Sequence, residues 1–278
     1  MQKEVVYLSD DHVASLTAYL FEESTQGGAP WMPQQRPAIL VVPGGGYAIC
    51  SDREADPVAL TFITAGYQAF VLNYHCGEAS AYPTPLVEIA RAVAHIRGHS
   101  AEYGIDADKI AAIGFSAGGH LTALLGSSWH RDSLADLTGL PVEDMRLNAA
   151  ILGYPVANLR AFITRAEPRE PGKPPYGAMI RDYAPHKDPL ALVNPLTPPT
   201  YLFHTLGDRL LPPLETLAYV EALLLHGVPC EYHLFSAGEH GLSTADSLSC
   251  HGWDYPRRVH AWVPMALAWL NDLFQYEF

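Results

Sequence analysis

Short apolar runs alternate with helix-length amphipathic segments along most of this chain, and this alternation restricts its fold more than any other feature. Residues 37–42, 69–74 and 110–113 are mainly apolar runs of the kind that buried parallel strands show. Residues 55–65 and about 83–97 lie between these runs, and the second segment has apolar residues at helical spacing. The pattern predicts an α/β fold, with a mostly parallel sheet covered by helices on both faces.

The alternation continues toward the C-terminus, where we expect strands at residues 149–152, 200–203 and 231–235 and a final helix over about 256–274. At the N-terminus, residues 5–8 and 14–21 are expected to form an antiparallel pair of strands at one edge of the sheet. Two regions, 127–148 and 157–193, break the pattern, and the second is rich in proline. Long irregular insertions in compact domains are often lids or binding loops. We therefore expect a single domain over residues 1–278, with lid-like or substrate-binding insertions in these two regions.

The composition excludes several classes of protein. Apolar residues make up 49% of the chain and charged residues 17%, a balance that intrinsically disordered chains do not have. The net charge of −13 argues against nucleic acid or an anionic membrane surface as partners. The four cysteines are widely spaced and form no pair typical of a zinc site, so we expect reduced thiols. No signal-peptide pattern opens the chain and no run approaches the roughly 18 apolar residues of a membrane span, which predicts a cytoplasmic protein.

The candidate nucleophile is Ser116, in the sequence G-F-S-A-G-G-H at residues 114–120. This G-x-S-x-G motif follows one predicted buried strand directly and opens a helix. A sharp strand-to-helix turn lifts a serine hydroxyl above the sheet, and flanking glycines relieve the crowding of its strained backbone. The motif alone arises by chance in some chains, whereas its position between strand and helix favours a nucleophile over a structural turn.

A glycine run at residues 43–47, P-G-G-G-Y, ends the predicted strand 37–42. Acyl transfer by serine needs two N–H donors that face the carbonyl oxygen as it becomes an oxyanion. We expect one from Ala117, directly after the nucleophile, and the other from Gly45 or Gly46. A phosphate-binding loop is excluded because no Gly-Lys-Ser/Thr ending and no G-x-G-x-x-G follow. A plain glycine turn is the remaining alternative.

Of the thirteen histidines, His240 has the position that a general base requires. In strand–turn–helix hydrolases of this kind the chain order is serine, then acid, then histidine, and His240 follows the last predicted strand. Asp208 follows the strand at 200–203 and lies between Ser116 and His240, so it is the candidate acid that orients the imidazole. A turn aspartate and a surface histidine are the structural alternatives, and Glu239 and Asp246 are weaker substitutes for the acid. His120 is expected to be a structural neighbour of the nucleophile.

These motifs, P-G-G-G-Y, G-F-S-A-G-G-H, T-x-x-D at 205–208 and F-x-x-G-x-H-G at 235–241, resemble those of the α/β-hydrolase serine esterases. The likeness is strongest to the bacterial acetylesterase and acetylxylan-esterase-like branch, labelled lipase/esterase, and runs from about residue 15 to the final helix. It implies the α/β-hydrolase fold, with Ser116, Asp208 and His240 similar to the family's nucleophile, acid and base. Two positions depart from the pattern: Pro43 stands where many lipases have histidine, and His75 stands where relatives often have arginine.

The resemblance implies a serine carboxylesterase for short acyl esters, most of all acetyl groups on plant-type oligosaccharides, with no cofactor and no metal. Tyr47, Tyr176 and Tyr183 are candidate substrate contacts because their rings could line a sugar-sized site, although ordinary packing explains tyrosines equally well. Other acyl hydrolases use the same triad, so an arylformamidase, a small peptidase or an inactive hydrolase-fold binding module remain alternatives. Members of the family are often dimers, and the resemblance therefore allows a homodimer.

Overall fold

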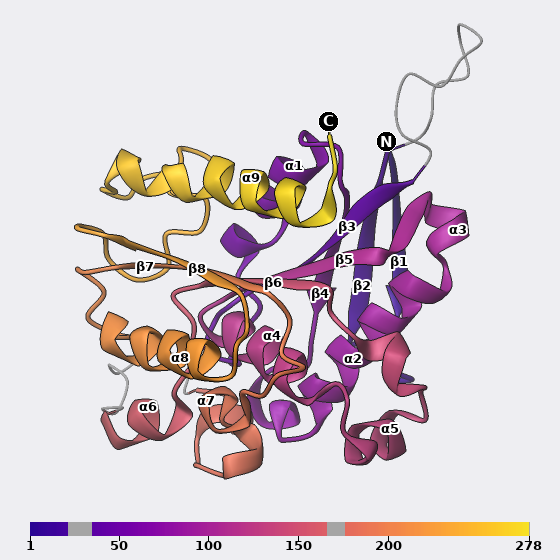
Figure 1. The fold of residues 1–278 in the computed structure, drawn as a ribbon, viewed down its shortest axis with the longest axis horizontal. Coiled ribbons are helices and arrows are strands. Elements are labelled where there is room, and N and C mark those ends of the chain that lie inside the picture. Colours follow the sequence, from indigo (N-terminus) through magenta and orange to yellow (C-terminus); the bar gives the residue numbers. More distant parts are fainter. Residues whose placement is uncertain (22–34, 166–175, 278) are drawn as a thin grey trace, which may run out of the picture.

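The computed structural model describes residues 1–21, 35–165 and 176–277. Its described residues form one eight-stranded sheet with the strand order β1-β2-β4-β3-β5-β6-β7-β8 (Figure 1). The strands are β1 (Gln2–Tyr7), β2 (Ser15–Leu20), β3 (Arg36–Val42), β4 (Gln68–Asn73), β5 (Ile105–Phe115), β6 (Ala149–Gly153), β7 (Thr200–Thr205) and β8 (Cys230–Phe235). β1 and β2 pair antiparallel at the edge, β2 pairs antiparallel with β4, and all later pairings are parallel. The predicted α/β fold, with its antiparallel edge pair, is confirmed.

Helices cover both faces of the sheet (Figure 1). On one face lie α1 (Asp56–Ile63) and α9 (Trp262–Phe274). The other face is covered by α2 (Thr84–Gly98), α4 (Ala117–Ser128) and α8 (Pro213–Leu225). Four shorter helices lie at the margins of this second face: α3 (Ser100–Tyr103), α5 (Asp132–Thr138), α6 (Leu159–Arg165) and α7 (Pro189–Leu192). The expected final helix over 256–274 is divided into a 3₁₀ turn at Arg257–Ala261 and α9. Pro264 explains the division, because it has no N–H to donate to the carbonyl of residue 260 and is tolerated only in a first turn.

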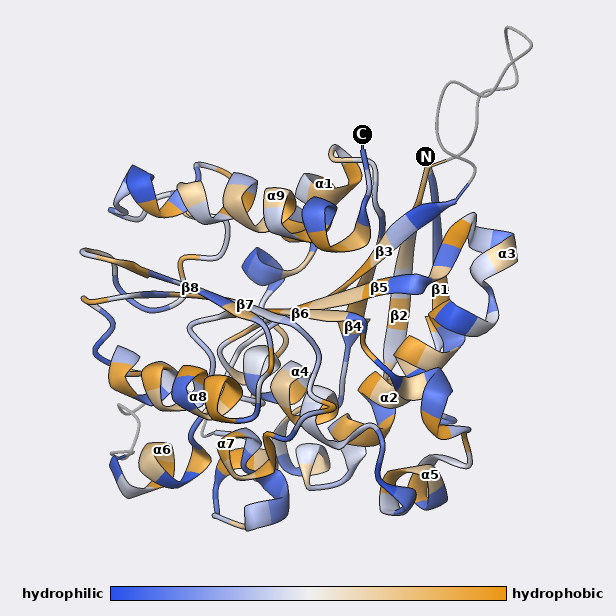
Figure 2. Ribbon diagram, viewed as in Figure 1, coloured by the Kyte–Doolittle hydropathy of each residue, from blue (hydrophilic) through white to orange (hydrophobic). Residues whose placement is uncertain are grey.

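The core consists of two apolar layers, one on each side of the sheet. Alternate residues of a strand point to opposite faces, so Leu40 packs toward α2 and α4 whereas Ile39 and Val41 pack toward α1 and α9. Figure 2 shows the same arrangement, with apolar strands in the middle layer and mixed polar and apolar helices outside it. Because both faces are covered, the central strands are apolar along their length, as the sequence predicted.

The two regions that break the sequence pattern contain short helices. Residues 127–148 include α5 and a 3₁₀ turn at Val142–Met145, and their apolar side chains Leu134 and Met145 are buried in the core beside α2. Residues 157–193 include α6, α7 and two 3₁₀ turns, and residues 166–175 lie outside the described residues. A lid role for the second region stays a prediction.

Candidate active site

Ser116 occupies a strained turn between β5 and α4. Its backbone has φ 52° and ψ −114°, a conformation that non-glycine residues rarely adopt. The turn is so tight that a Cβ on Gly118 would lie 2.0 Å from the carbonyl oxygen of Val42, and one on Gly114 would lie 2.3 Å from the carbonyl oxygen of Gly118. Glycine is therefore required at both positions, which explains the G-x-S-x-G spacing. Strain of this kind persists only where the surrounding structure holds it.

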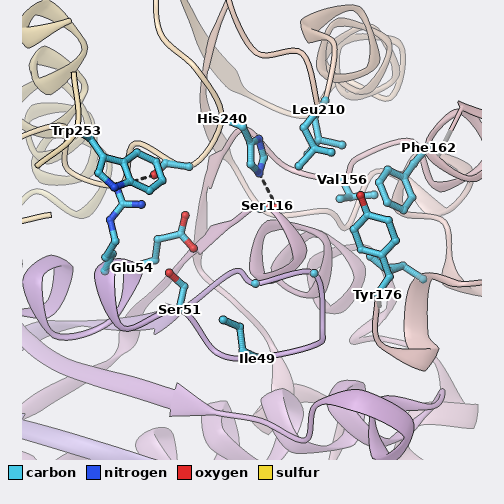
Figure 3. Close-up of a pocket in the computed structure, with 16 residues that line it drawn as sticks. Ile49, Ser51, Glu54, Ser116, Val156, Phe162, Tyr176, Leu210, His240 and Trp253 are labelled. Atoms are coloured by element: carbon cyan, nitrogen blue, oxygen red, sulfur yellow. Dashed lines mark hydrogen bonds between the residues drawn. The ribbon is translucent and has the colours of Figure 1, made fainter. Parts of the chain in front are cut away.

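The three residues selected from the sequence form one chain of hydrogen bonds. The Ser116 hydroxyl lies 2.9 Å from Nε2 of His240, and Nδ1 of His240 lies 2.7 Å from Oδ2 of Asp208 (Figure 3). Because a carboxylate only accepts, Nδ1 carries the proton and Nε2 is free to accept from the serine. The loops after β5, β7 and β8 supply these residues, so the carboxyl ends of three parallel strands converge on one point.

The side chain of Asp208 is fully buried, and both of its carboxylate oxygens accept hydrogen bonds. Its Oδ1 accepts the backbone N–H groups of Leu210 and Leu211 at 3.0 and 2.8 Å, and its Oδ2 accepts from His240 and, at 3.1 Å, from His204. Burial alone would raise the pKa of Asp208, but the hydrogen bonds from the two histidines and the backbone outweigh it and hold the pKa well below its usual range. The carboxylate is therefore ionised at neutral pH.

His204 is a member of the site that the sequence did not single out. It is fully buried on β7, and its Nε2 faces both Asp208 Oδ2 and the carbonyl oxygen of Leu211, at 3.1 and 2.8 Å. Both are acceptors, so Nε2 carries the proton, and Nδ1 accepts from the hydroxyl of Thr216 at 2.8 Å. His204 is thus a second hydrogen-bond donor to Asp208, beside His240. Its position four residues before Asp208 is only a weak signal for this contact in the sequence.

The glycine loop lies directly beside Ser116. The N–H of Gly44 donates to Oε2 of the buried Glu54 at 2.9 Å, so it is not available to a substrate. Gly45 and Gly46, with φ values of 118° and 65°, line the same pocket as Ser116 and His240. Ala117 is the first residue of α4, where backbone N–H groups have no acceptor within the helix. The loop and the helix end thus face one side of the nucleophile.

Glu54 and Tyr154 connect this glycine loop to the histidine loop. The second carboxylate oxygen of Glu54 accepts from the hydroxyl of Tyr154 at 2.7 Å, and that hydroxyl accepts from the backbone N–H of Ser243 at 2.7 Å. The Tyr154 ring also packs edge-on against the His240 ring, with 5.0 Å between centroids. No motif marked Glu54 or Tyr154 in the sequence, because the contacts join residues 100 and 89 positions apart and no local spacing encodes them.

Ser116 opens into a pocket of about 200 Å³. Figure 3 shows Trp253, Glu54 and Ser51 to one side of His240, and Leu210, Val156, Phe162 and Tyr176 to the other. The remaining lining residues are Gly45, Gly46, Ile49, Arg53, Ile180, Leu211 and Gly241. Within residues 1–21, 35–165 and 176–277, no group of three or more His, Cys, Asp or Glu side chains could hold a metal ion.

The structure separates the three candidate tyrosines. Tyr176 lines the pocket, whereas Tyr183 does not and instead packs under the guanidinium of Arg160, 4.4 Å from the ring centroid. Tyr47 corrects the prediction: it is completely buried, and its hydroxyl donates to Nδ1 of His120 at 2.8 Å. Its ring belongs to the core and packs against the rings of Tyr74 and His120. His120 donates from Nε2 to the carbonyl oxygen of Lys187, and burial lowers the pKa of His120 to about 4, so it is neutral and structural.

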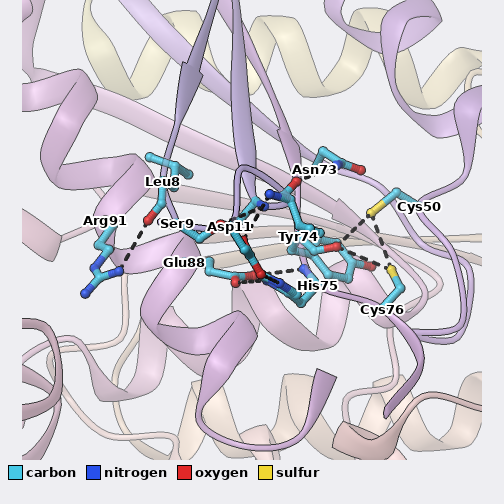
Figure 4. A network of polar contacts seen from close by, with 12 residues as sticks. Leu8, Ser9, Asp11, Cys50, Asn73, Tyr74, His75, Cys76, Glu88 and Arg91 are labelled. Atoms are coloured by element: carbon cyan, nitrogen blue, oxygen red, sulfur yellow. Dashed lines mark hydrogen bonds and ion pairs between the residues drawn. The ribbon is translucent and has the colours of Figure 1, made fainter. Parts of the chain in front are cut away.

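His75, which stands where relatives often have arginine, is the centre of a polar network with Asp11 and Glu88 (Figure 4). Its Nδ1 contacts Oε1 of Glu88 on α2, and its Nε2 lies 2.9 Å from Oδ2 of Asp11, in the turn between β1 and β2. Burial opposes the charged form, but hydrogen bonds to the two carboxylates prevail and raise the pKa of His75. Nearby, the thiols of Cys50 and Cys76 lie 3.8 Å apart, at hydrogen-bonding distance for sulfur, and form no disulfide with each other. The network fixes the edge hairpin to the body of the sheet.

A strained serine at the end of a central parallel strand, with an aspartate and a histidine after the last two strands, is the arrangement that defines the α/β-hydrolase class. The sequence profile of one family in this class, BD-FAE, matches residues 30–223, and the chain belongs to that family. No helix in the described part of the chain is long and apolar enough to cross a membrane.

Curated relatives and solved structures agree with this assignment. The chain is 29% identical over 250 residues to endo-1,4-beta-xylanase B of Butyrivibrio fibrisolvens, covering 87% of this chain and 36% of that protein. It is 27% identical over 248 residues to an acetylxylan esterase of Xylanibacter ruminicola, covering 86% of this chain and 46% of that protein. It thus spans less than half the length of these two relatives.

Among solved structures, the carboxylesterase Cest-2923 from Lactobacillus plantarum is similar over 100% of both chains, with a TM-score of 0.86 and 29% identity. Together with the family match, this likeness confirms the predicted fold and the predicted place among the α/β-hydrolase esterases, on an acetylxylan-esterase-like branch.

Proposed function

We propose that this chain is a serine carboxylesterase that removes short acyl groups, above all acetyl groups, from acetylated plant-type oligosaccharides. The observation that carries the proposal is the hydrogen-bonded series Ser116–His240–Asp208 at the mouth of a pocket, with distances of 2.9 and 2.7 Å. These are the distances at which a general base takes a proton from a nucleophile and an acid fixes the base's tautomer.

In the proposed reaction Oγ of Ser116 attacks the ester carbonyl carbon while its proton passes to Nε2 of His240. The N–H groups of Ala117 and of Gly45 or Gly46 stabilise the oxyanion, and one such donor is worth about 10²–10³ in rate. Collapse of the tetrahedral intermediate breaks the ester C–O bond, and the imidazolium protonates the departing alcohol. Water, deprotonated by His240, then hydrolyses the acyl-enzyme. The ionised Asp208 stabilises the imidazolium in both steps.

The substrate class rests on the pocket and on the relatives. A volume of about 200 Å³ suits a short acyl group with part of its alcohol and leaves little room for a long acyl chain. The xylanase and the acetylxylan esterase named above are both named for xylan, a plant polysaccharide. Acetylated xylo-oligosaccharides are therefore the first substrates to test.

The test measures acetate release from acetylated xylo-oligosaccharides and hydrolysis of p-nitrophenyl acetate, for wild type and Ser116→Ala. We expect both substrates to be cleaved and the variant to lose several orders of magnitude in kcat on each, because no other group supplies the nucleophile. Cleavage of the nitrophenyl ester alone would overturn the sugar assignment and keep the serine mechanism. Equal activity of variant and wild type would overturn the mechanism itself.

A further inference from the structure

We propose that Trp253 and Arg53 form a binding platform for the sugar of the leaving alcohol, and that the opposite, apolar end of the pocket holds the acyl group. This inference rests on the proposed function and assigns its two substrate halves to the two sides of His240. We call the first side the open end, which includes Ser51, Arg53 and Trp253. We call the second the closed end; its buried side chains are Val156, Phe162, Ile180 and Leu211, and it also includes the exposed Leu210 and the partly buried Tyr176.

The closed end is shaped for a small apolar group. Each of these four buried side chains has at most 2% of its surface exposed. None has a side-chain hydrogen-bonding group, and Phe162 is further fixed by an edge-on contact with Tyr176, 5.1 Å between ring centroids. An acetyl methyl group is stabilised by leaving water for these apolar side chains, whereas the hydroxyl groups of a sugar would lose their hydrogen bonds to water there.

The open end has the opposite character. Trp253 is 52% exposed although it lines the pocket, an unusual state for so large an apolar ring. The guanidinium of Arg53 covers one face of the indole, 3.8 Å from the ring centroid. One face of the indole is thus supported by a cation, which leaves the other as a flat apolar surface suited to the C–H face of a pyranose ring. The Ser51 hydroxyl lines the same end of the pocket and can bond a sugar hydroxyl.

The platform is fixed to the loop of the general base. Nη2 of Arg53 donates to the carbonyl oxygen of Gly241 at 3.0 Å, directly after His240, and its Nε contacts the carbonyl oxygen of Ser249. The leaving alcohol oxygen must come within hydrogen-bond reach of Nε2 of His240 to receive its proton. A ring held by the residues next to His240 is therefore on the side where the alcohol must depart (Figure 3).

The experiment compares acetate release from acetylated xylo-oligosaccharides with acetate release from ethyl acetate, whose alcohol is too short to reach the platform. We expect Trp253→Ala to lower kcat/KM on the oligosaccharides by about 10-fold, mainly through KM, and to leave ethyl acetate within about 2-fold of wild type. Trp253→Phe, which keeps a ring, should recover most of the loss. Tyr7→Ala is the matched control, because Tyr7 is an exposed ring stacked on His12 far from the pocket, and it should change neither substrate.

Equal losses on both substrates would overturn the platform, because Trp253 would then act only by holding the His240 loop. No loss on the oligosaccharides would overturn it as well. Failure of the proposed function has a different signature: wild-type enzyme would cleave ethyl acetate but no sugar acetate, and the sugar assignment of the platform would fall with it. If wild type cleaves both and Trp253→Ala is normal, the proposed function stands and only the platform is lost.

Discussion

At the scale of single residues, Asp208 is the group on which the base depends. Asp208→Asn places an amide against Nδ1 of His240, which favours the wrong imidazole tautomer and leaves the imidazolium without a counter-charge. We expect kcat to fall by about 10⁴, measured with p-nitrophenyl acetate. Glu239→Gln and Asp246→Asn are the matched controls, since both residues were weaker candidates for the acid and the two ring nitrogens of His240 are bonded to Asp208 and Ser116 instead. A larger loss in either control than in Asp208→Asn would contradict the assignment.

Glu54 acts one step further from the reacting atoms, as a positioning residue for the glycine loop. Glu54→Gln can still accept from the Gly44 N–H through its carbonyl oxygen, but its NH₂ then faces the Tyr154 hydroxyl, which must accept where it now donates and loses the acceptor for its own proton. Since the proposed mechanism has the glycine loop stabilise the oxyanion, we expect kcat to fall about 10-fold with KM nearly unchanged. Glu78→Gln, on an exposed residue paired with Arg181, is the control and should be silent. A change in KM alone would refute the positioning role.

At the scale of elements, the His75 network that fixes the β1–β2 hairpin predicts a pH-dependent stability. The raised pKa of His75 means that its ion pairs with Asp11 and Glu88 contribute fully below about pH 6.5, the ordinary histidine pKa. That contribution is lost as the pH rises through the folded pKa. His75→Arg keeps its charge, so its Tm relative to wild type should rise by about 2–4 °C between pH 6 and pH 9. His75→Gln, which is never charged, should lie below wild type at pH 6 and approach wild type by pH 9, because wild type loses its ion pairs over that range. A pH-independent difference for both variants would contradict the network's role.

Phe162 on α6 lines the apolar end of the pocket, where the proposal places the acyl group, so it is the residue that we expect to limit acyl length. Phe162→Leu removes part of a ring from this wall, and we expect the ratio of kcat/KM for butyrate over acetate to rise several-fold. The measurement uses p-nitrophenyl esters of both acids at one pH. Phe274→Leu is the matched control, because Phe274 is a buried phenylalanine on α9, on the other face of the sheet. An unchanged ratio in Phe162→Leu would place the acyl group elsewhere.

At the scale of the whole molecule, the sequence was informative wherever the chemistry is local. The apolar strand runs predicted the sheet, and the tight turn around Ser116, which tolerates only glycine at 114 and 118, made the nucleophile visible as a motif. Asp208 and His240 followed from chain order. The sequence did not predict the contact between Glu54 and Tyr154 or the contact between Arg53 and Trp253. Both join segments that are far apart in the sequence. Tyr47 was misplaced for the same reason: a tyrosine beside a glycine loop has no local signal for which side of the loop it packs on.

The assembled molecule, and not any single segment, should make Ser116 reactive. Its activation needs β5, β7 and β8 to bring three loops together, so a fluorophosphonate should phosphonylate the folded chain once and the urea-unfolded chain not at all. Intact-mass spectrometry measures the single adduct, and peptide mapping places it on Ser116. Ser116→Ala should take up no label, and His240→Ala should react more slowly by orders of magnitude, because the serine then lacks its base. A folded wild-type chain that resists labelling would favour an inactive binding module instead, since such a protein keeps the fold without an activated serine.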